Sequence, residues 1–285
     1  MLSTNFISVI VFQLKFEIIC SSNKDSLVLN KNYYKQIDKC IEIIRNLNPD
    51  ICVFPEMSYQ ERYDDIFKEL SKDDKIIIFG SSYDNRINKT KIFNNANLVE
   101  VVKRYPCGSE PMTRIYERIT VEDFIANYLK EHEFYIKGEK IYILNCLEYY
   151  KVAYMIARNE KLSKNLFGFI VPCSNSNPNV FIDESRAIHN HNENIYSFVC
   201  NRIKGNGKEG YGRSYIFGPI QYHEKEWLSE ESIVSENHNS SILTLDSFTP
   251  SYVYGKYAIP NTVSRFGRSD LYINTPREIK VESLI

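Results

Sequence analysis

The sequence has no excess of charge of either sign. It contains 35 Lys and Arg residues against 36 Asp and Glu residues, which leaves a formal net charge of −1 at pH 7. Such a balance produces no overall field that would attract nucleic acid or an anionic membrane surface. Basic residues such as Lys103, Arg104 and Arg202 are scattered rather than gathered in a stripe, so we do not expect nucleic-acid binding.

Paired cysteine motifs are also missing. Seven cysteines, an odd number without any CxxC pair, predict neither a disulfide framework nor a zinc site. His189 and His191 stand two apart in an expected helix, so they point to different faces and make a poor metal pair. We therefore expect reduced thiols in a cytoplasmic protein. The cysteines are Cys20, Cys40, Cys52, Cys107, Cys146, Cys173 and Cys200.

The sequence also lacks the signals of export and of membrane insertion. The apolar run at residues 6–14 is too short to span a bilayer. Residues 1–5 before it lack the basic start of a secretory signal. Neither secretion nor membrane anchoring is therefore predicted.

What the sequence does have is an alternation of strand-like and helix-like segments. At residues 32–47 apolar side chains recur every three or four positions, which predicts an amphipathic helix. The alternation favours sheets covered by helices, and we predict an α/β fold in one domain spanning residues 1–285. The expected strands are residues 6–14, 51–54, 75–79, 140–145, 167–172, 195–200, 214–217 and 241–245, and the further helices are residues 61–70, 147–159 and 183–193.

Two residues with useful chemistry lie where the chain leaves an expected strand. Glu56 follows the strand at residues 51–54, and Cys146 lies between the strand at residues 140–145 and the next helix. In folds of this class such loops gather catalytic groups. A thiol reacts as the thiolate, which a nearby base and a helix N-terminus both favour. Cys146 is thus a candidate nucleophile, whereas the other cysteines are expected to be inert core residues.

Several segments, taken in order along nearly the whole chain, share features with a known family. Residues 49–56 read Pro-Asp-Ile-Cys-Val-Phe-Pro-Glu, and residues 138–146 form a strand-like run that ends in Cys146. The other matching segments are residues 7–14, 169–174, 185–201 and 212–214 with Pro219. Together they resemble the nitrilase (carbon–nitrogen hydrolase) superfamily. The resemblance implies a nitrilase-like fold of four layers, an αββα sandwich.

The resemblance also implies roles for particular residues. Glu56 matches the family's general base and Cys146 its nucleophile. In that family a lysine and the backbone N–H after the cysteine, here that of Leu147, bind the developing oxyanion. The best-placed match for the lysine is Arg118; Lys103 is the other candidate, although it lies closer to Glu56 in sequence than the family's spacing suggests. Arginine is longer and planar, so this exchange is not conservative, and loss of one oxyanion donor typically slows a reaction about 100- to 1000-fold.

Many members of the family hold a second glutamate near the site, between the lysine and the cysteine. Glu122 is the first candidate for it, followed by Glu131 or Glu133. Glu148 stands where the family usually has an aspartate, and we expect it to orient the turn without taking a chemical step. Tyr149, just after the nucleophile, is expected to line the substrate pocket.

The implied activity is hydrolysis of a non-peptide carbon–nitrogen bond in a small amide or nitrile, through a thioester on Cys146. It requires neither a metal nor an organic cofactor. Members of the family commonly pair through helices beside the nucleophile, so we expect a homodimer or larger assembly. The alternative is a nitrilase-like binding or scaffold protein whose catalysis is impaired by Arg118.

Overall fold

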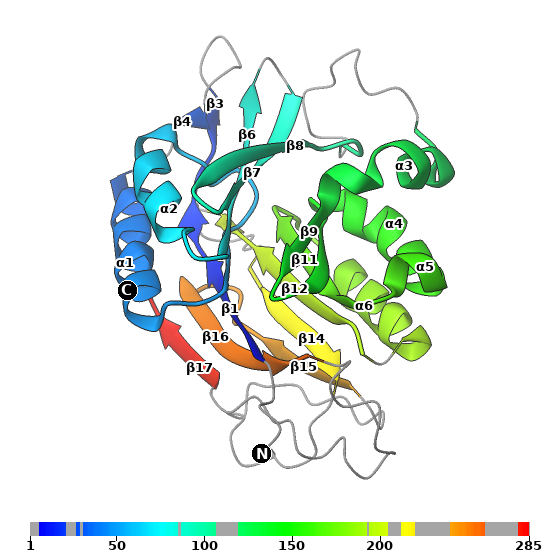
Figure 1. Ribbon diagram of the computed structural model, residues 1–285. Helices are drawn as coiled ribbons and strands as arrows, with labels where there is room; N and C mark the ends of the chain where they lie inside the picture. Colours follow the sequence, from blue (N-terminus) through cyan, green and yellow to red (C-terminus); the bar gives the residue numbers. More distant parts are fainter. Residues whose placement is uncertain are drawn as a thin grey trace.

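Two large β-sheets lie face to face, and a layer of helices covers the outer face of each (Figure 1). They belong to a computed structural model that describes residues 6–20, 27–28, 31–84, 87–106, 119–192, 194–204, 212–219, 240–259 and 279–284. The predicted α/β fold with four αββα layers is confirmed. Helices α1 (Lys31–Leu47) and α2 (Asp64–Leu70) cover the first sheet, and α3 (Val121–Asn127), α4 (Leu147–Arg158), α5 (Glu160–Ser163) and α6 (Asn179–His191) cover the second.

The first sheet has the strand order β17-β16-β1-β5-β6-β7-β8. Its central strands β1, β5 and β6 run parallel, so their carboxyl ends meet at one edge. The remaining neighbours pair antiparallel. The strands are β1 (Phe6–Gln13), β5 (Ile51–Val53), β6 (Ile76–Asp84), β7 (Ile87–Asn94), β8 (Asn97–Val102), β16 (Ser251–Ala258) and β17 (Ile279–Ser283).

The second sheet has the order β15-β14-β12-β11-β10-β9 and a parallel centre formed by β10, β11 and β12. Its strands are β9 (Glu133–Ile136), β10 (Glu139–Ile143), β11 (Leu166–Cys173), β12 (Tyr196–Asn201), β14 (Tyr215–Pro219) and β15 (Ser240–Thr244). Short strands and turns complete the described elements: β2 (Lys15–Phe16) with β13 (Ile203–Lys204), β3 (Ile19–Cys20) with β4 (Leu27–Val28), and the 3-10 helices η1 (Glu61–Tyr63) and η2 (Leu129–His132).

Strand β1 shows why its sequence is apolar without interruption. Val9 and Val11 face the core between the two sheets, whereas Ile10 and Phe12 face the core beneath α1 and α2. Successive side chains of a strand point to opposite faces, so a strand covered on both sides needs apolar residues at every position. Three apolar cores result, one between the sheets and one under each helix layer. No helix in the described part of the chain is long and apolar enough to span a membrane.

The hairpin formed by β7 and β8 is an element that the sequence patterns did not predict. Its turn consists of Asn95 and Ala96, both with positive φ (49° and 63°), between the paired residues Asn94 and Asn97. Two-residue hairpins of this kind usually carry Asn-Gly, because glycine adopts positive φ without steric cost. Because the second position is alanine, the sequence did not indicate a turn here, and the last two strands of the first sheet were not predicted.

Candidate active site

Glu56 lies in the turn that follows β5, and its position is held mainly by backbone contacts. Its amide donates a hydrogen bond to the carbonyl oxygen of Cys173 at 3.2 Å, and only 2% of the residue is exposed. Gly80 on β6 (φ +62°) makes room for this turn: a Cβ there would lie 2.1 Å from the carbonyl oxygen of Pro55. A glycine on the neighbouring strand therefore lets the turn pack closely enough to present Glu56 toward the second sheet.

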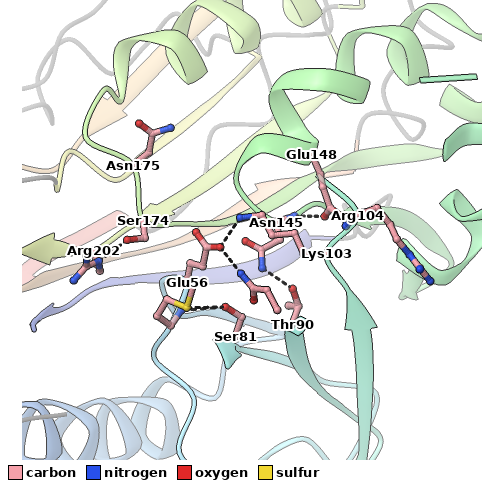
Figure 2. Close-up of polar contacts among 12 residues, drawn as sticks. Glu56, Ser81, Thr90, Lys103, Arg104, Asn145, Glu148, Ser174, Asn175 and Arg202 are labelled. Atoms are coloured by element: carbon pink, nitrogen blue, oxygen red, sulfur yellow. Dashed lines mark hydrogen bonds and ion pairs between the residues drawn. The ribbon is translucent and has the colours of Figure 1, made fainter. Parts of the chain in front are cut away.

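Lys103 lies directly against Glu56. Its Nζ is 2.7 Å from Oε1 of Glu56, and both side chains are buried. The side-chain amide of Asn88, on β7, donates to the same oxygen at 2.9 Å. Figure 2 shows the Lys103 ammonium pointing toward the Glu56 carboxylate. The Asn88 carbonyl also accepts the backbone N–H of Lys103 at 2.9 Å. A buried carboxylate is strongly destabilising without such partners, so the cation and the amide together allow Glu56 to stay inside the protein.

The cation beside Glu56 is thus the residue that the sequence ranked second. Lys103 follows β8 immediately. The β7–β8 hairpin places it opposite Asn88, so both residues lie beside Glu56. The spacing argument disfavoured Lys103 because it did not include this hairpin. Arg118, the residue ranked first, lies outside the described residues.

Cys146 lies at the junction between β10 and α4 in an uncommon backbone conformation. Its φ of 51° and ψ of −108° place a side chain where L residues rarely occur. Strain of this kind persists when the surrounding structure enforces it, and it is concentrated at functional sites. Cys146 precedes the first residue of α4, Leu147, whose amide has no partner within its own helix. The Leu147 amide, next to Cys146 along the chain, can therefore donate to negative charge that develops at this turn.

Cys173, the last residue of β11, connects the two halves of the site. Its carbonyl accepts the Glu56 amide, and the carbonyl of the preceding residue, Pro172, accepts the Cys146 amide at 2.9 Å. Burial raises the pKa of the Cys173 thiol well above its usual range, and the neighbouring Cys146 and Glu56 raise it further. Glu56 and Cys146 come from different sheets, and both lie beside the end of β11.

Glu148 ties the segment that carries the cation to the turn that carries the cysteine. It is fully buried, with 0% exposure. One of its oxygens accepts the backbone N–H of Arg104 at 2.6 Å, and the other accepts the backbone N–H of Asn145 at 2.9 Å (Figure 2). These two amides immediately follow Lys103 and precede Cys146. A single carboxylate therefore fixes the backbone on both sides of the site.

The three glutamates that the sequence offered as the second acid lie elsewhere. Glu122 is exposed in the first turn of α3. Glu131 is exposed and pairs with the Arg104 guanidinium at 3.2 Å. Glu133 is half-buried and pairs with Lys130. Among the described residues it is Glu148 whose carboxylate bridges the two sides, and the signal in the sequence was its position two residues after Cys146.

Tyr149 packs inside the second helix layer. It is fully buried, and its hydroxyl is hydrogen-bonded to the hydroxyls of Ser185 at 2.7 Å and Ser197 at 2.9 Å. Successive residues of a helix are rotated by about 100°, so Tyr149 points into the core formed with α6 and β12 while Leu147 begins the helix. We therefore leave Tyr149 out of the proposed substrate contacts.

Asn145 supplies an additional polar group beside the cysteine. Its Nδ2 donates to Oγ1 of Thr90 on β7 at 2.9 Å, and this side-chain hydrogen bond links the two sheets. Its Oδ1 is buried and has no hydrogen-bond partner in the described part of the protein. An unsatisfied buried oxygen of this kind is destabilising and is a natural acceptor for a ligand N–H.

As for metals, the described residues contain no group of three or more His, Cys, Asp or Glu side chains that could hold an ion.

Comparison with known proteins gives similarity at the level of solved structures. The chain matches no protein-family model and no curated protein. It is similar to Nit3 of Saccharomyces cerevisiae, a member of branch 10 of the nitrilase superfamily, with 15% identity and a TM-score of 0.47 over 74% of this chain and 82% of that one. It is also similar to XC1258 of Xanthomonas campestris, with 12% identity and a TM-score of 0.49 over 75% of this chain and 83% of that one.

Both similar structures are nitrilase-superfamily proteins. XC1258 is described as a CN-hydrolase superfamily protein with an arsenic adduct in its active site. The chemical roles proposed below follow from the contacts of this chain's own residues.

Proposed function

We propose that this chain hydrolyses a non-peptide carbon–nitrogen bond in a small amide or nitrile, with Cys146 as the nucleophile. The observation that carries the proposal is the buried Lys103–Glu56 pair, which shares a neighbour, Cys173, with a cysteine in a strained turn at the start of α4. A carboxylate, an ammonium and a thiol are the groups that acyl transfer through a thioester needs. The resemblance of the sequence segments supports the substrate class.

In the first half of the reaction Glu56 takes the proton of the Cys146 thiol, and the thiolate attacks the amide carbon. The carbonyl oxygen becomes an oxyanion, which the Lys103 ammonium and the Leu147 N–H stabilise. An ammonium carries three donors, so one lysine can bind Glu56 and an oxyanion together. When the tetrahedral intermediate collapses, Glu56 returns its proton to the departing nitrogen, and the acyl group remains on the Cys146 sulfur.

In the second half Glu56 accepts a proton from water while the water oxygen attacks the thioester carbon. The same donors stabilise the second oxyanion. Collapse breaks the carbon–sulfur bond, the proton on Glu56 passes to the sulfur, and a carboxylic acid leaves. For a nitrile, the first adduct is a thioimidate, and one more water molecule is consumed to release ammonia.

Two residues have positioning roles in this proposal. Glu148 fixes the backbone that carries Lys103 and Cys146, so that cation and nucleophile keep their relative placement when substrate enters. Asn145 presents Oδ1 to the substrate nitrogen, which matches the N–H groups of an amide. The proposal makes Arg118 unnecessary as the catalytic cation.

The test uses a panel of short aliphatic and aromatic amides and nitriles, with release of ammonia as the readout. Cys146→Ala and Glu56→Gln should each abolish turnover, whereas Cys40→Ala should retain it. Cys40 is the matched control because it is a buried thiol in the core beneath α1 and not in the site. Circular dichroism checks that each variant is folded. Turnover that survives in both site variants would overturn the proposal.

Chloroacetamide labelling separates this function from the binding or scaffold alternative. The hydrolase predicts both labelling of Cys146 and ammonia release. Labelling of Cys146 without turnover of any amide or nitrile would favour the alternative. The proposal also retains the single domain over residues 1–285 and the homodimer or larger assembly expected from the sequence. Light scattering of the purified chain measures the assembly.

A further inference from the structure

Cys146 and Cys173 occupy opposite positions on neighbouring parallel strands. The β10–β11 pairing of Ile143 with Ile170 continues beyond β10. The Leu144 amide donates to the Ile170 carbonyl at 3.0 Å, and the Cys146 amide donates to the Pro172 carbonyl at 2.9 Å. In a parallel ladder this pattern sets Cys146 directly across from Cys173. Adjacent strands lie about 4.8 Å apart, within the range of roughly 4.4 to 6.8 Å between the Cα atoms of disulfide-linked cysteines.

The two side chains also belong to the same buried cluster beneath α3, α4 and α6. Cys146 is among the neighbours that raise the pKa of the Cys173 thiol, and each residue is at most 4% exposed. The other described cysteines with placed side chains differ: Cys200 donates to the carbonyl of Phe12 at 3.0 Å, and Cys40 and Cys52 belong to the core beneath α1 and α2. Two cysteines at opposed positions of neighbouring strands, one of them the proposed nucleophile, are more than the inert core cysteine that the sequence patterns predicted for Cys173.

We propose that Cys146 and Cys173 form a redox-active pair, in which peroxide converts the two thiols into a disulfide that reversibly blocks the site. In the first step hydrogen peroxide transfers one oxygen to the Cys146 sulfur, giving a sulfenic acid and one water. In the second step the Cys173 sulfur attacks the Cys146 sulfur, the sulfur–oxygen bond breaks, and the hydroxide leaves as water with the Cys173 proton. Two electrons pass from the thiols to one peroxide. A dithiol reductant returns both thiols.

The surroundings of the two thiols fit these roles, in which Cys146 is oxidised first and Cys173 then forms the disulfide. Cys146 is the proposed nucleophile at the start of α4, and a nucleophilic thiol is the kind that peroxide oxidises. Cys173 is more deeply buried, and its raised pKa keeps it protonated and unreactive until a sulfenic acid forms beside it. A sulfenic acid without a neighbouring thiol is oxidised further to sulfinic acid, which is not readily reversed. Cys173 therefore protects Cys146 against irreversible oxidation.

The decisive experiment measures mass and does not require turnover. The full-length chain is treated first with one equivalent and then with a second equivalent of hydrogen peroxide, and its intact mass and non-reduced tryptic peptides are determined after each addition. Wild type should lose about 2 Da and give one peptide pair cross-linked through Cys146 and Cys173, which dithiothreitol releases. Cys40→Ala should behave identically. Cys173→Ser should gain about 16 Da and then about 32 Da as Cys146 is oxidised, with no cross-link.

The proposal is overturned if wild type accumulates the sulfinic acid at the same rate as Cys173→Ser, or if its disulfides join other cysteines. The wild-type cross-link decides the matter even if Cys173→Ser does not fold. The loss of activity on oxidation rests on the proposed function, whereas the mass change does not. A cross-link without any amide or nitrile turnover would therefore remove the hydrolase and leave the thiol pair. Where turnover is present, dithiothreitol should restore it in peroxide-treated wild type but not in Cys173→Ser.

Discussion

The two sheets contribute to the site in physically different ways. The first sheet supplies charge: Glu56 and Lys103 form a buried ion pair, and Asn88 donates to the same carboxylate oxygen. The second sheet supplies geometry: Cys146 is held at positive φ between a strand ladder and a helix start. A buried ion pair stabilises the fold only while both partners remain. A strained turn destabilises the fold and persists because the surrounding elements enforce it. We therefore expect loss of an ion-pair partner to destabilise the first half, and loss of the Cβ at Cys146 to relieve strain in the second half.

The largest effect should follow loss of the cation in the first half. Lys103→Met leaves the buried Glu56 carboxylate without this ammonium, and we expect the free energy of unfolding to fall by about 3–5 kcal/mol in urea titrations. Lys89→Met is the matched control. Lys89, on β7, pairs with Asp84 and Glu100, and the side chains of these two acids are exposed. A surface pair of this kind is worth about 0–1 kcal/mol.

A second substitution sharpens this prediction. Adding Glu56→Gln to Lys103→Met removes the buried charge and should recover part of the lost stability, because an amide is less costly to bury than a carboxylate. Equal losses for Lys103→Met and Lys89→Met, or no recovery in the double variant, would show that the Lys103–Glu56 pair does not stabilise the first half.

Replacing Gly80, which packs against the Glu56 turn, should give the next largest loss of stability. Gly80 and Gly138 both have positive φ (62° and 84°), so alanine at either position incurs the left-handed penalty of about 1–2 kcal/mol. At Gly80 the new Cβ would also meet the carbonyl oxygen of Pro55 at 2.1 Å, and overpacking adds about 1–3 kcal/mol. At Gly138 nothing lies within 4 Å.

Thermal unfolding of the two glycine variants compares them directly. Gly80→Ala should be the less stable, and it should also lose turnover because the Glu56 turn must move. Gly138→Ala should keep turnover. If Gly138→Ala proved as destabilised as Gly80→Ala, the close approach of Pro55 to β6 would have no energetic significance.

The sequence was informative about strand ends and less so about side chains that reach the site across the sheets. Phe54-Pro55-Glu56 and the strand-to-helix turn at Cys146 could be located because proline and apolar periodicity mark where elements stop. The ion pair of Lys103 with Glu56 could not be predicted, because the Asn95–Ala96 turn has no glycine to mark the hairpin that precedes Lys103. The pairing of Cys173 with Cys146 depends on strand register, which local patterns do not reveal.

Glu148 and Tyr149 show the same limit within one helix turn. Both follow Cys146 closely, and from the sequence we expected Tyr149 to line the pocket and Glu148 only to orient the turn. The structure buries Tyr149 against serines of α6 and β12, and it turns Glu148 toward the backbone of Asn145 and Arg104. Which face of a helix meets the site depends on how the helix is docked onto its sheet, and that is a tertiary property.

The smallest effect on stability should appear at Cys146, where the difference between glycine and alanine should have the opposite sign from that in a regular strand. Glycine adopts positive φ without the steric penalty that a Cβ brings, so Cys146→Gly should be more stable than Cys146→Ala by about 1 kcal/mol. Cys52 is the matched control, since it is a buried cysteine in the regular strand β5. There glycine should be less stable than alanine by about 0.5–1 kcal/mol.

Urea unfolding of the four variants therefore yields two differences of opposite sign. The comparison within each position cancels the loss of the sulfur, so only the backbone preference remains. If glycine were the less stable choice at both positions, the turn at Cys146 would carry no strain. The second half of the site would then be held by the same packing as an ordinary strand, and its contrast with the charged half would disappear.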